Sequence, residues 1–316
     1  MLAYIIRRLL LLIPVLLIVG VIVFTLMHLT PGDAASVMLG RDATEEQKIA
    51  LRERLGLDEP VPVQFINWFW AALRLDFGNS LFMGKPVIDA LLERAEPTVL
   101  LALYSLTLSV IIAIPAGVIA AVRANTPVDR LLMVVSISGV AIPSFFFGIL
   151  LILLFAVILG WLPSGGYVDI GIDPIEHFKY MILPTLTLGF SAAGLLARLV
   201  RSTMLDVLNE DYVRTAYSKG LEERRVVMAH AFRNALIPAL TIVGATFAGM
   251  LGGAVVIENV FNIPGLGRLL VQSVVRRDIP VVQGAVMTVA AIEVLIMLLV
   301  DLLYVYIDPR IRYGTD

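Results

Sequence analysis

Residues 98–122 read TVLLALYSLTLSVIIAIPAGVIAAV, and no side chain in this stretch carries a charge. A membrane-spanning α-helix needs about 20 consecutive apolar residues to cross the hydrocarbon core of a bilayer. This stretch is long enough for one such helix. The composition agrees, because 59% of the 316 residues are hydrophobic and 16% are charged, whereas soluble domains contain about 25% charged residues. We therefore predict an all-α membrane protein.

Five further stretches have the length and apolar character of a membrane span. They cover residues 9–29, 131–159, 181–197, 235–257 and 279–307. The last of them is the only one with acidic residues inside it, Glu293 and Asp301. The first follows Arg7 and Arg8, exceeds the length of a signal-peptide core and precedes no small-residue cleavage site, so we expect it to be retained as an anchor. The prediction is six transmembrane helices.

The Lys and Arg residues predict which side of the membrane each connection faces. Thirteen of them fall at the termini and in the connections after the second and fourth spans, and four fall in the two short connections on the other side. Basic residues concentrate in cytoplasmic connections. We therefore expect cytoplasmic termini, with an N-terminal anchor over 1–30, an extracytoplasmic lobe over 31–96, a transmembrane core over 97–307 that includes a cytoplasmic loop over 198–235, and a cytoplasmic tail over 308–316.

The lobe is predicted to contain two helices. Thr44 and Gln47 have the spacing of a capping box at the start of a helix over 45–55, and Gly56 is placed to end it. In the second helix four apolar residues share one face at helical spacing, Phe65, Trp68, Phe69 and Leu73. We expect this face either to rest on the membrane interface or a neighbouring subunit, or to pack on the protein's own helices.

The connection before the last span predicts a turn followed by a short helix. Asn262, Pro264, Gly265 and Gly267 are residues that punctuate regular structure, and residues 266–275 are amphipathic. Irregular backbone at membrane depth is tolerated where it is surrounded by protein or lines a water-filled cavity. These four residues are therefore candidates for lining or closing a pathway. The alternative is a simple surface helix.

Several kinds of chemistry are not predicted. The sequence lacks the GxxxxGK[ST] loop that holds nucleotide phosphates, it has no cysteine, and its three histidines form no H-E-x-x-H pair. Ser191 in GFSA has no histidine in a later span to activate it, so we interpret it as a small packing residue. We therefore expect no catalytic residue and no metal site.

Glu293 is the acidic residue nearest the middle of a predicted span. A carboxylate in hydrocarbon is costly and usually faces a cavity or a partner. Glu293 is a candidate pathway residue, either as a proton or ion site or as a group hydrogen-bonded to a neighbouring helix.

Residues 211–238, DYVRTAYSKGLEERRVVMAHAFRNALIP, form a polar, basic segment between two apolar spans. We predict a short helix with an apolar face made by Tyr212, Val213, Ala216 and Tyr217, a left-handed turn at Gly220, and a second helix opened by Leu221, Glu222 and Glu223. Pro238 then marks entry into the fifth span. Small Ala216 and Gly220 would let another protein's backbone approach closely, and the alternative is an amphipathic loop held by anionic lipid.

This segment resembles the EAA loop of ABC-importer permeases, in which small residues, a following glycine and a distal I-x-x-P or L-P form a coupling helix. Arg214 and Thr215 stand where many members have Glu and Ala, a departure that is similar to the peptide-transport subfamily. Motifs elsewhere agree, including LRERLGLDEPVPVQF, DFGNSL, ENVFNIPGLGRLL, RDIPVVQG and DLLYVYIDPRIRYG. The chain is identified as a member of the B-type permeases of dipeptide, oligopeptide or glutathione importers, and nickel importers look similar.

The resemblance implies the type I ABC importer permease (MetI-like) architecture in the cell inner membrane, with no enzymatic activity. It implies that a cytoplasmic ATPase subunit binds the coupling loop at Arg214, Thr215, Ala216, Gly220, Leu221, Glu222 and Pro238. It also implies a second homologous permease subunit, two ABC ATPases that bind ATP and Mg, and an extracytoplasmic substrate-binding protein, with no cofactor in this chain and no nucleic acid.

Two other functions stay open at this point. One is a nickel-type importer permease. The other is a secondary transporter in which Glu293 couples transport to an ion.

Overall fold

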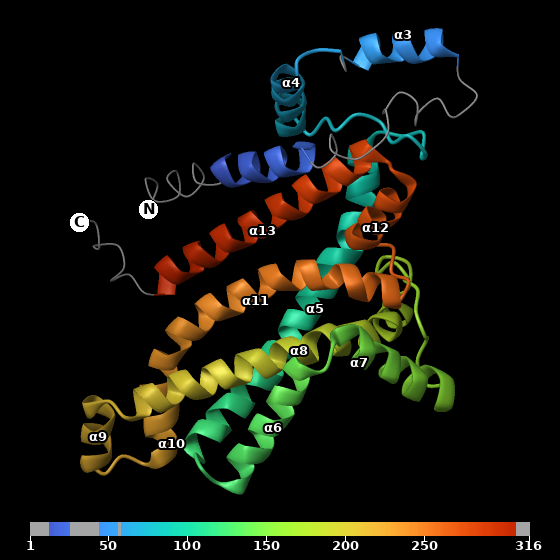
Figure 1. Cartoon of the computed structure of the whole chain (residues 1–316). Helices are drawn as coiled ribbons and strands as arrows, with labels where there is room; N and C mark the ends of the chain where they lie inside the picture. The colour runs from blue at the N-terminus through green and yellow to red at the C-terminus, as the bar shows by residue number, and fades with distance from the viewer. Residues whose placement is uncertain (1–12, 26–43, 56–57, 308–316) are drawn as a thin grey trace, which may run out of the picture. The chain divides into compact units, whose positions relative to one another are not determined.

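A computed structural model of the chain describes residues 13–25, 44–55 and 58–307, and its regular elements there are helices (Figure 1). In chain order they are Ile13–Thr25, α3 (Glu45–Leu55), α4 (Val61–Leu73), α5 (Val87–Val122), α6 (Pro127–Ala141), α7 (Ser144–Leu151), the π-helix η1 (Ile152–Ile158), α8 (Pro174–Leu208), α9 (Asp211–Ser218), α10 (Glu223–Arg225), the π-helix η2 (Val226–Phe232), α11 (Arg233–Val260), α12 (Leu266–Arg276) and α13 (Ile279–Ile307). The predicted all-α class is confirmed. The chain divides into unit 1, residues 1–96 with 265–294, and unit 2, residues 97–264 with 295–316.

The observed helices match the predicted membrane spans to different degrees. Four segments are long and apolar enough to cross a membrane, Val87–Val122, Pro174–Leu208, Ile242–Val260 and Ile279–Val300. A fifth crossing requires the bent pair Pro127–Ala141 and Ser144–Ile158 to count as one span, and Ile13–Thr25 is a shorter apolar helix. These are findings for the described residues only, and they do not establish the number six.

The span predicted over 131–159 is not one continuous helix. The chain bends by 102° between α6 and the following helix pair. Proline disfavours helical backbone in the residue before it and has no N–H to donate. Ile142, directly before Pro143, is accordingly extended, with φ −81° and ψ 124°. The uncharged run is therefore two helical segments joined at a proline break.

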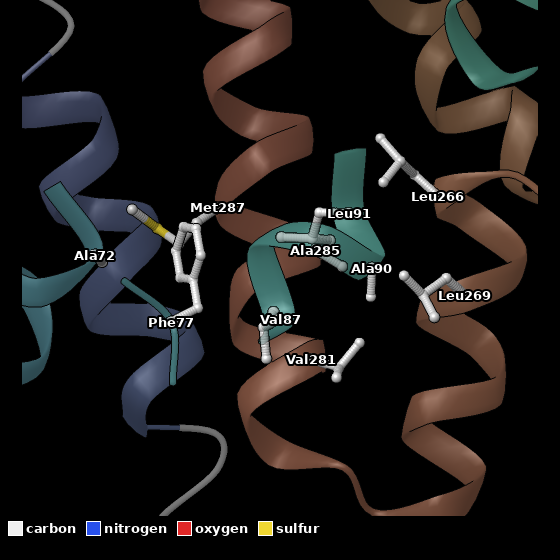
Figure 2. Close-up of a cluster of buried hydrophobic side chains, with 10 residues drawn as sticks. All are labelled: Ala72, Phe77, Val87, Ala90, Leu91, Leu266, Leu269, Val281, Ala285 and Met287. Atoms are coloured by element: carbon white, nitrogen blue, oxygen red, sulfur yellow. The ribbon is translucent and has the colours of Figure 1, made fainter. Parts of the chain in front are cut away.

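Unit 1 is held together by a buried apolar cluster that joins the start of α5 to α12 and α13 (Figure 2). Its members are Ala72, Phe77, Val87, Ala90, Leu91, Leu266, Leu269, Val281, Ala285 and Met287. Close packing needs a small residue at Gly284, where an added Cβ would lie 2.8 Å from the Val87 side chain. A buried carboxylate, Asp278, holds the loop that precedes α5. It accepts hydrogen bonds from the Ser80 hydroxyl at 2.5 Å and the Leu81 amide at 3.2 Å.

The lobe helices begin and end largely as predicted. Thr44 and Gln47 form the reciprocal capping box, with amide-to-side-chain distances of 3.1 and 3.3 Å, and α3 covers Glu45–Leu55. Gly56 lies outside the described residues. The apolar face of α4 packs on the helix Ile13–Thr25, because Phe24 contacts Phe65 and Trp68 at ring-centroid distances of 5.4 and 5.8 Å. This face therefore packs on the protein's own helices, which is one of the two arrangements expected, and Leu73 is not part of it, being 47% exposed.

In unit 2, small residues bring α5, α6 and α8 into close contact. An added Cβ at Gly117 would lie 2.7 Å from the Ala197 carbonyl oxygen, and one at Gly139 would lie 2.9 Å from the Phe190 carbonyl oxygen. Small residues at helix–helix contacts are typical of membrane proteins, where the backbones must approach closely for dispersion contacts to form. This packing aligns α8 against its neighbours over much of its length.

Candidate functional site

The segment after α8 folds as a helix, a glycine turn and a second helix. α9 ends in a Schellman motif, in which the Leu221 amide donates to the Ala216 carbonyl at 3.4 Å and the Gly220 amide donates to the Tyr217 carbonyl at 2.9 Å. Gly220 has φ +75°, the left-handed conformation that was predicted. An added Cβ at Gly220 would meet no atom within 4 Å. The glycine is therefore required by backbone conformation and not by space. We call α9, this turn and α10 the platform.

A small apolar core holds α9 against the second helix. Val213, Ala216 and Val226 are buried together, with Leu208 and Leu221 packed at the edge. The prediction that Ala216 is open to a partner's backbone is wrong, because its side chain is 7% exposed and faces this core. Tyr212 and Tyr217 are each 42% exposed, so the predicted four-residue apolar face is divided between core and surface.

A side-chain hydrogen bond also joins α9 to α11. The Asn234 amide nitrogen donates to the Tyr212 hydroxyl at 2.8 Å and to the His230 carbonyl at 3.0 Å. Sequence reasoning missed this pair. The motif FRNALIP contained Asn234, but nothing in the pattern indicated which residue it would contact.

The surface of the platform carries most of the residues predicted to contact a partner. Arg214, Thr215, Gly220 and Glu222 are exposed, and Leu221 is half-buried. The Arg214 side chain is 70% exposed and lies 3.5 Å from the Asp211 carboxylate, which is itself 96% exposed. Exposed ion pairs of this kind contribute little to stability, so Arg214 is not held in place strongly by its own loop.

Pro238 and Tyr217 are two further exposed residues of this segment. Pro238 is exposed and lies inside α11, a few residues before the apolar stretch Ile242–Val260 that is long enough to cross a membrane. On the platform, partial burial raises the pKa of the Tyr217 hydroxyl, and the nearby Glu223 carboxylate raises it further. Tyr217 is therefore a neutral hydrogen-bonding group on this surface.

Buried contacts hold together the helices that lie next to the platform in the chain. One apolar cluster packs the end of α8 against η2 and α11, and its members are Ala121, Val200, Met204, Val227, Ala231, Ala235 and Ala239. The Arg201 guanidinium of α8 binds the Asp129 carboxylate of α6 through two hydrogen bonds of 2.6 and 2.7 Å. Asp129 also accepts the Asn125 amide at 2.9 Å. Sequence reasoning missed this ion pair because its partners are far apart in the chain.

A groove of about 540 Å³ lies in unit 2 between the proline break, α8 and α11. Its lining residues are Val140, Ser144, Leu188, Ser191, Ala192, Leu195, Ile242, Ala245, Thr246, Gly249, Met250 and Gly253. None of these side chains carries a charge. Ser191, interpreted from the sequence as a small packing residue, is one of them. The groove is apolar, with hydroxyl groups from three of its residues.

At the end of α11, Glu258 is fully buried and accepts the Thr98 hydroxyl at 2.5 Å. The Gly166 amide donates to the Phe261 carbonyl at 2.7 Å, and Asn262 takes φ +57° in the turn that follows. Glu258 was part of the quoted motif ENVFNIPG but was not singled out. The signal available in the sequence was its position, because Glu258 is a carboxylate one residue beyond the predicted span over 235–257.

The predicted pathway residues differ in exposure and do not line the groove. Asn262 is exposed and Pro264 half-buried in unit 2, whereas Gly265 and Gly267 are buried in unit 1, where Gly265 precedes α12 as its N-cap. Glu293 is half-buried in the part of α13 that belongs to unit 1. None of them is among the residues that line the groove. Within the part of the chain that the structure describes, no group of three His, Asp or Glu residues is arranged to hold a metal ion.

The sequence matches two family descriptions that together cover most of the chain. Residues 113–313 match "Binding-protein-dependent transport system inner membrane component", and residues 1–102 match "Binding-prot-dependent transport system membrane comp, N-term". The chain is 46% identical to a probable peptide ABC transporter permease of Sinorhizobium fredii, over 98% of this chain and 99% of the relative. It is also 46% identical to the glutathione transport system permease GsiC of Escherichia coli K12, over 99% and 100%.

Solved structures show the same fold at low sequence identity. The MetNI methionine ABC transporter in an inward-facing conformation matches with a TM-score of 0.55 and 18% identity, over 69% of this chain and 96% of that one. An amino acid ABC transporter crystallised with histidines matches with a TM-score of 0.52 and 16% identity, over 70% and 94%. The chain thus belongs to the binding-protein-dependent transport system inner membrane components, as a non-enzymatic permease subunit of an ABC importer.

Proposed function

We propose that this subunit forms half of a translocation pathway for short peptides and that it works by alternating access driven by two separate ATPase subunits. The observation that carries the proposal is that α8 and α11 serve two purposes. They provide most of the lining of the groove, and their other ends contact the platform, where Leu208 of α8 packs on the core of Val213, Ala216 and Val226 and Asn234 of α11 donates a hydrogen bond to Tyr212. A force applied to the platform is therefore transmitted to the walls of the groove.

The platform is the proposed contact with an ATPase on the cytoplasmic side. Arg214, Thr215, Gly220 and Glu222 are exposed and offer charges, a hydroxyl and bare backbone to a partner. The Schellman turn and the Val213–Ala216–Val226 core make this surface rigid. A rigid, exposed surface is what a moving partner needs to shift α8 and α11 together. Leu221 contributes from its half-buried position, whereas Ala216 supports the surface from beneath.

The groove supports a peptide as the substrate. Its hydroxyl groups, from Ser144, Ser191 and Thr246, can exchange hydrogen bonds with peptide amides, and its lack of charged lining residues avoids a fixed preference for one side-chain charge. The relatives named for peptide and glutathione transport agree with this substrate class. Selection among peptides would then belong mainly to the external binding protein. A second, homologous permease would provide the opposite wall.

The test is uptake by the transporter reconstituted in liposomes with its second permease, two ATPases and binding protein. We expect labelled dipeptides, tripeptides or glutathione to accumulate only when ATP is enclosed with the ATPases. Accumulation of nickel in place of any peptide would contradict the substrate assignment and support the nickel-type importer.

The same liposomes test the ion-coupled alternative. We expect Glu293→Gln to retain most ATP-dependent uptake, because Glu293 does not line the groove. Uptake driven by an ion gradient without ATP, and abolished by Glu293→Gln, would contradict the proposed mechanism. Asp206→Asn, which changes an exposed acidic residue on α8, is the matched control for loss of one carboxylate.

A further inference from the structure

The helix α4 contains no charged residue, although it belongs to the predicted extracytoplasmic lobe. Its sequence, VPVQFINWFWAAL, is apolar apart from Gln64 and Asn67. Only one residue of the helix, Ala72, is buried. A short helix that is apolar on most of its surface yet mostly exposed requires a further environment to cover it.

The sides of α4 have three different surroundings. The first is the packed side already described, where Phe65, Trp68 and Phe69 lie against the helix Ile13–Thr25. An added Cβ on Gly20 would lie 3.2 Å from the Phe69 ring, so the two helices touch closely. α4 runs across this helix, near the end that carries Phe24, rather than along it (Figure 1).

The second side is polar. The Gln64 side chain donates to the Glu59 carbonyl at 2.7 Å, and the Asn67 side chain donates to the Glu59 carboxylate at 3.2 Å. Glu59 is exposed and ionisable. This side of the helix therefore faces water.

The third side is an exposed apolar stripe, which we define as Val63, Ile66, Trp70 and Leu73. These side chains are 40%, 53%, 58% and 47% exposed. At about 100° per residue the four lie within roughly a quarter of the helix circumference, separate from both the packed side and the Glu59 side. Exposed apolar residues also cover the contacting helix, including Ile18 at 59% and Ile22 at 51%.

We propose that α4 is an interfacial membrane helix that lies at the lipid boundary with this stripe inserted into the bilayer. The contacting helix Ile13–Thr25 supplies the argument for lipid as the occupant. It is apolar, it belongs to an inner-membrane component, and its exposed side chains are those of a membrane helix. A helix that crosses the end of a membrane helix, with water on one side and an uncharged stripe on another, lies at the depth where tryptophan is enriched.

The exposed apolar stripe of α4 would have a structural role that is separate from substrate transport. It would fix the height and orientation of the lobe relative to the bilayer surface. The proposal does not depend on the peptide substrate or on the ATPase contact.

The chain contains no cysteine, so single-cysteine variants can be spin-labelled directly in the full-length subunit, assembled with its partners in nanodiscs. The positions are Ile66→Cys, Trp70→Cys and Leu73→Cys on the stripe, with Asn67→Cys on the Glu59 side as the matched control. The measurement is power-saturation EPR, which reports how often each spin label collides with two reagents, oxygen and a nickel chelate. Oxygen concentrates in lipid, whereas the nickel chelate stays in water. Cysteines of the partner subunits must be replaced or shown to be unlabelled.

We expect labels on the stripe to collide more with oxygen than with the nickel chelate, and the label at Asn67 to show the reverse. Greater access of the chelate at all stripe positions would overturn the proposal, because the stripe would then face water. Low access of both reagents would also overturn it, because the stripe would then be buried against another protein subunit. Both readings are independent of uptake activity.

Discussion

At the scale of single residues, Gly220 shows a requirement that belongs to the backbone alone. Its φ of +75° costs about 1–2 kcal/mol for residues with a Cβ, and no neighbour lies near the position of an added Cβ. We expect Gly220→Val to distort the turn and lower peptide uptake strongly, while the subunit still inserts and assembles. Gly220→Asn is the matched control, because Asn tolerates this conformation, and uptake should largely survive. Equal, wild-type uptake in both variants would show that the turn does not couple transport to ATP.

The Tyr212–Asn234 pair is a second residue-scale feature. It links α9 to α11 through one hydrogen bond of 2.8 Å, the kind of contact worth about 1 kcal/mol. We expect Tyr212→Phe and Asn234→Leu each to raise the amount of ATP hydrolysed per peptide transported, and the double variant to be no worse than either. Asn259→Leu is the control, since Asn259 bonds only its own helix, at the Val255 carbonyl. Additive effects in the double variant would contradict a direct pairing.

At the scale of elements, the ion pair between α6 and α8 joins two helices that close apolar packing also brings together. Asp129 is buried, with a side chain that is 5% exposed. Removing only Arg201 leaves a buried carboxylate without its cation, which costs about 3 kcal/mol. We expect Arg201→Met to lower the midpoint temperature of thermal unfolding of the purified subunit. The double variant Asp129→Leu with Arg201→Met should recover most of the lost midpoint temperature. The exposed Arg198→Met, one turn away, should change nothing. An unchanged midpoint in Arg201→Met would show that the pair is not stabilising.

At the scale of the whole molecule, the groove in unit 2 is the proposed pathway, and we expect that it must stay open for transport. Gly249 lines the groove, whereas Gly252 lies on the same helix outside the groove. An added Cβ at either position meets no atom within 4 Å. We expect Gly249→Trp to block uptake by filling the groove while ATP hydrolysis continues, and Gly252→Trp to retain uptake in an assembled complex. Blocked uptake in Gly252→Trp alone would place the pathway on another surface of α11.

What could be predicted from the sequence was mainly local. The length of uncharged runs predicted the four long apolar helices, the Thr44–Gln47 spacing predicted a helix start, and Gly220 predicted a left-handed turn. Each depends on residues within a few positions of one another, so a single sequence carries the information. The break at Pro143 was also local, and it was missed because the apolar run was considered without its proline.

The tertiary structure decided which residues meet. Asp129 and Arg201, Thr98 and Glu258, and Tyr212 and Asn234 pair only because their helices pack side by side. Packing also decided that Ala216 is buried and that Ser191 lines a groove. Helical periodicity fixes which residues share a face, but not which face meets which neighbour, since that depends on close contacts between segments distant in the chain. The sequence by itself determined the all-α class, the long apolar helices and the turn at Gly220, because these depend on residues close together in the chain, whereas helix packing determined the groove and its connection to the platform.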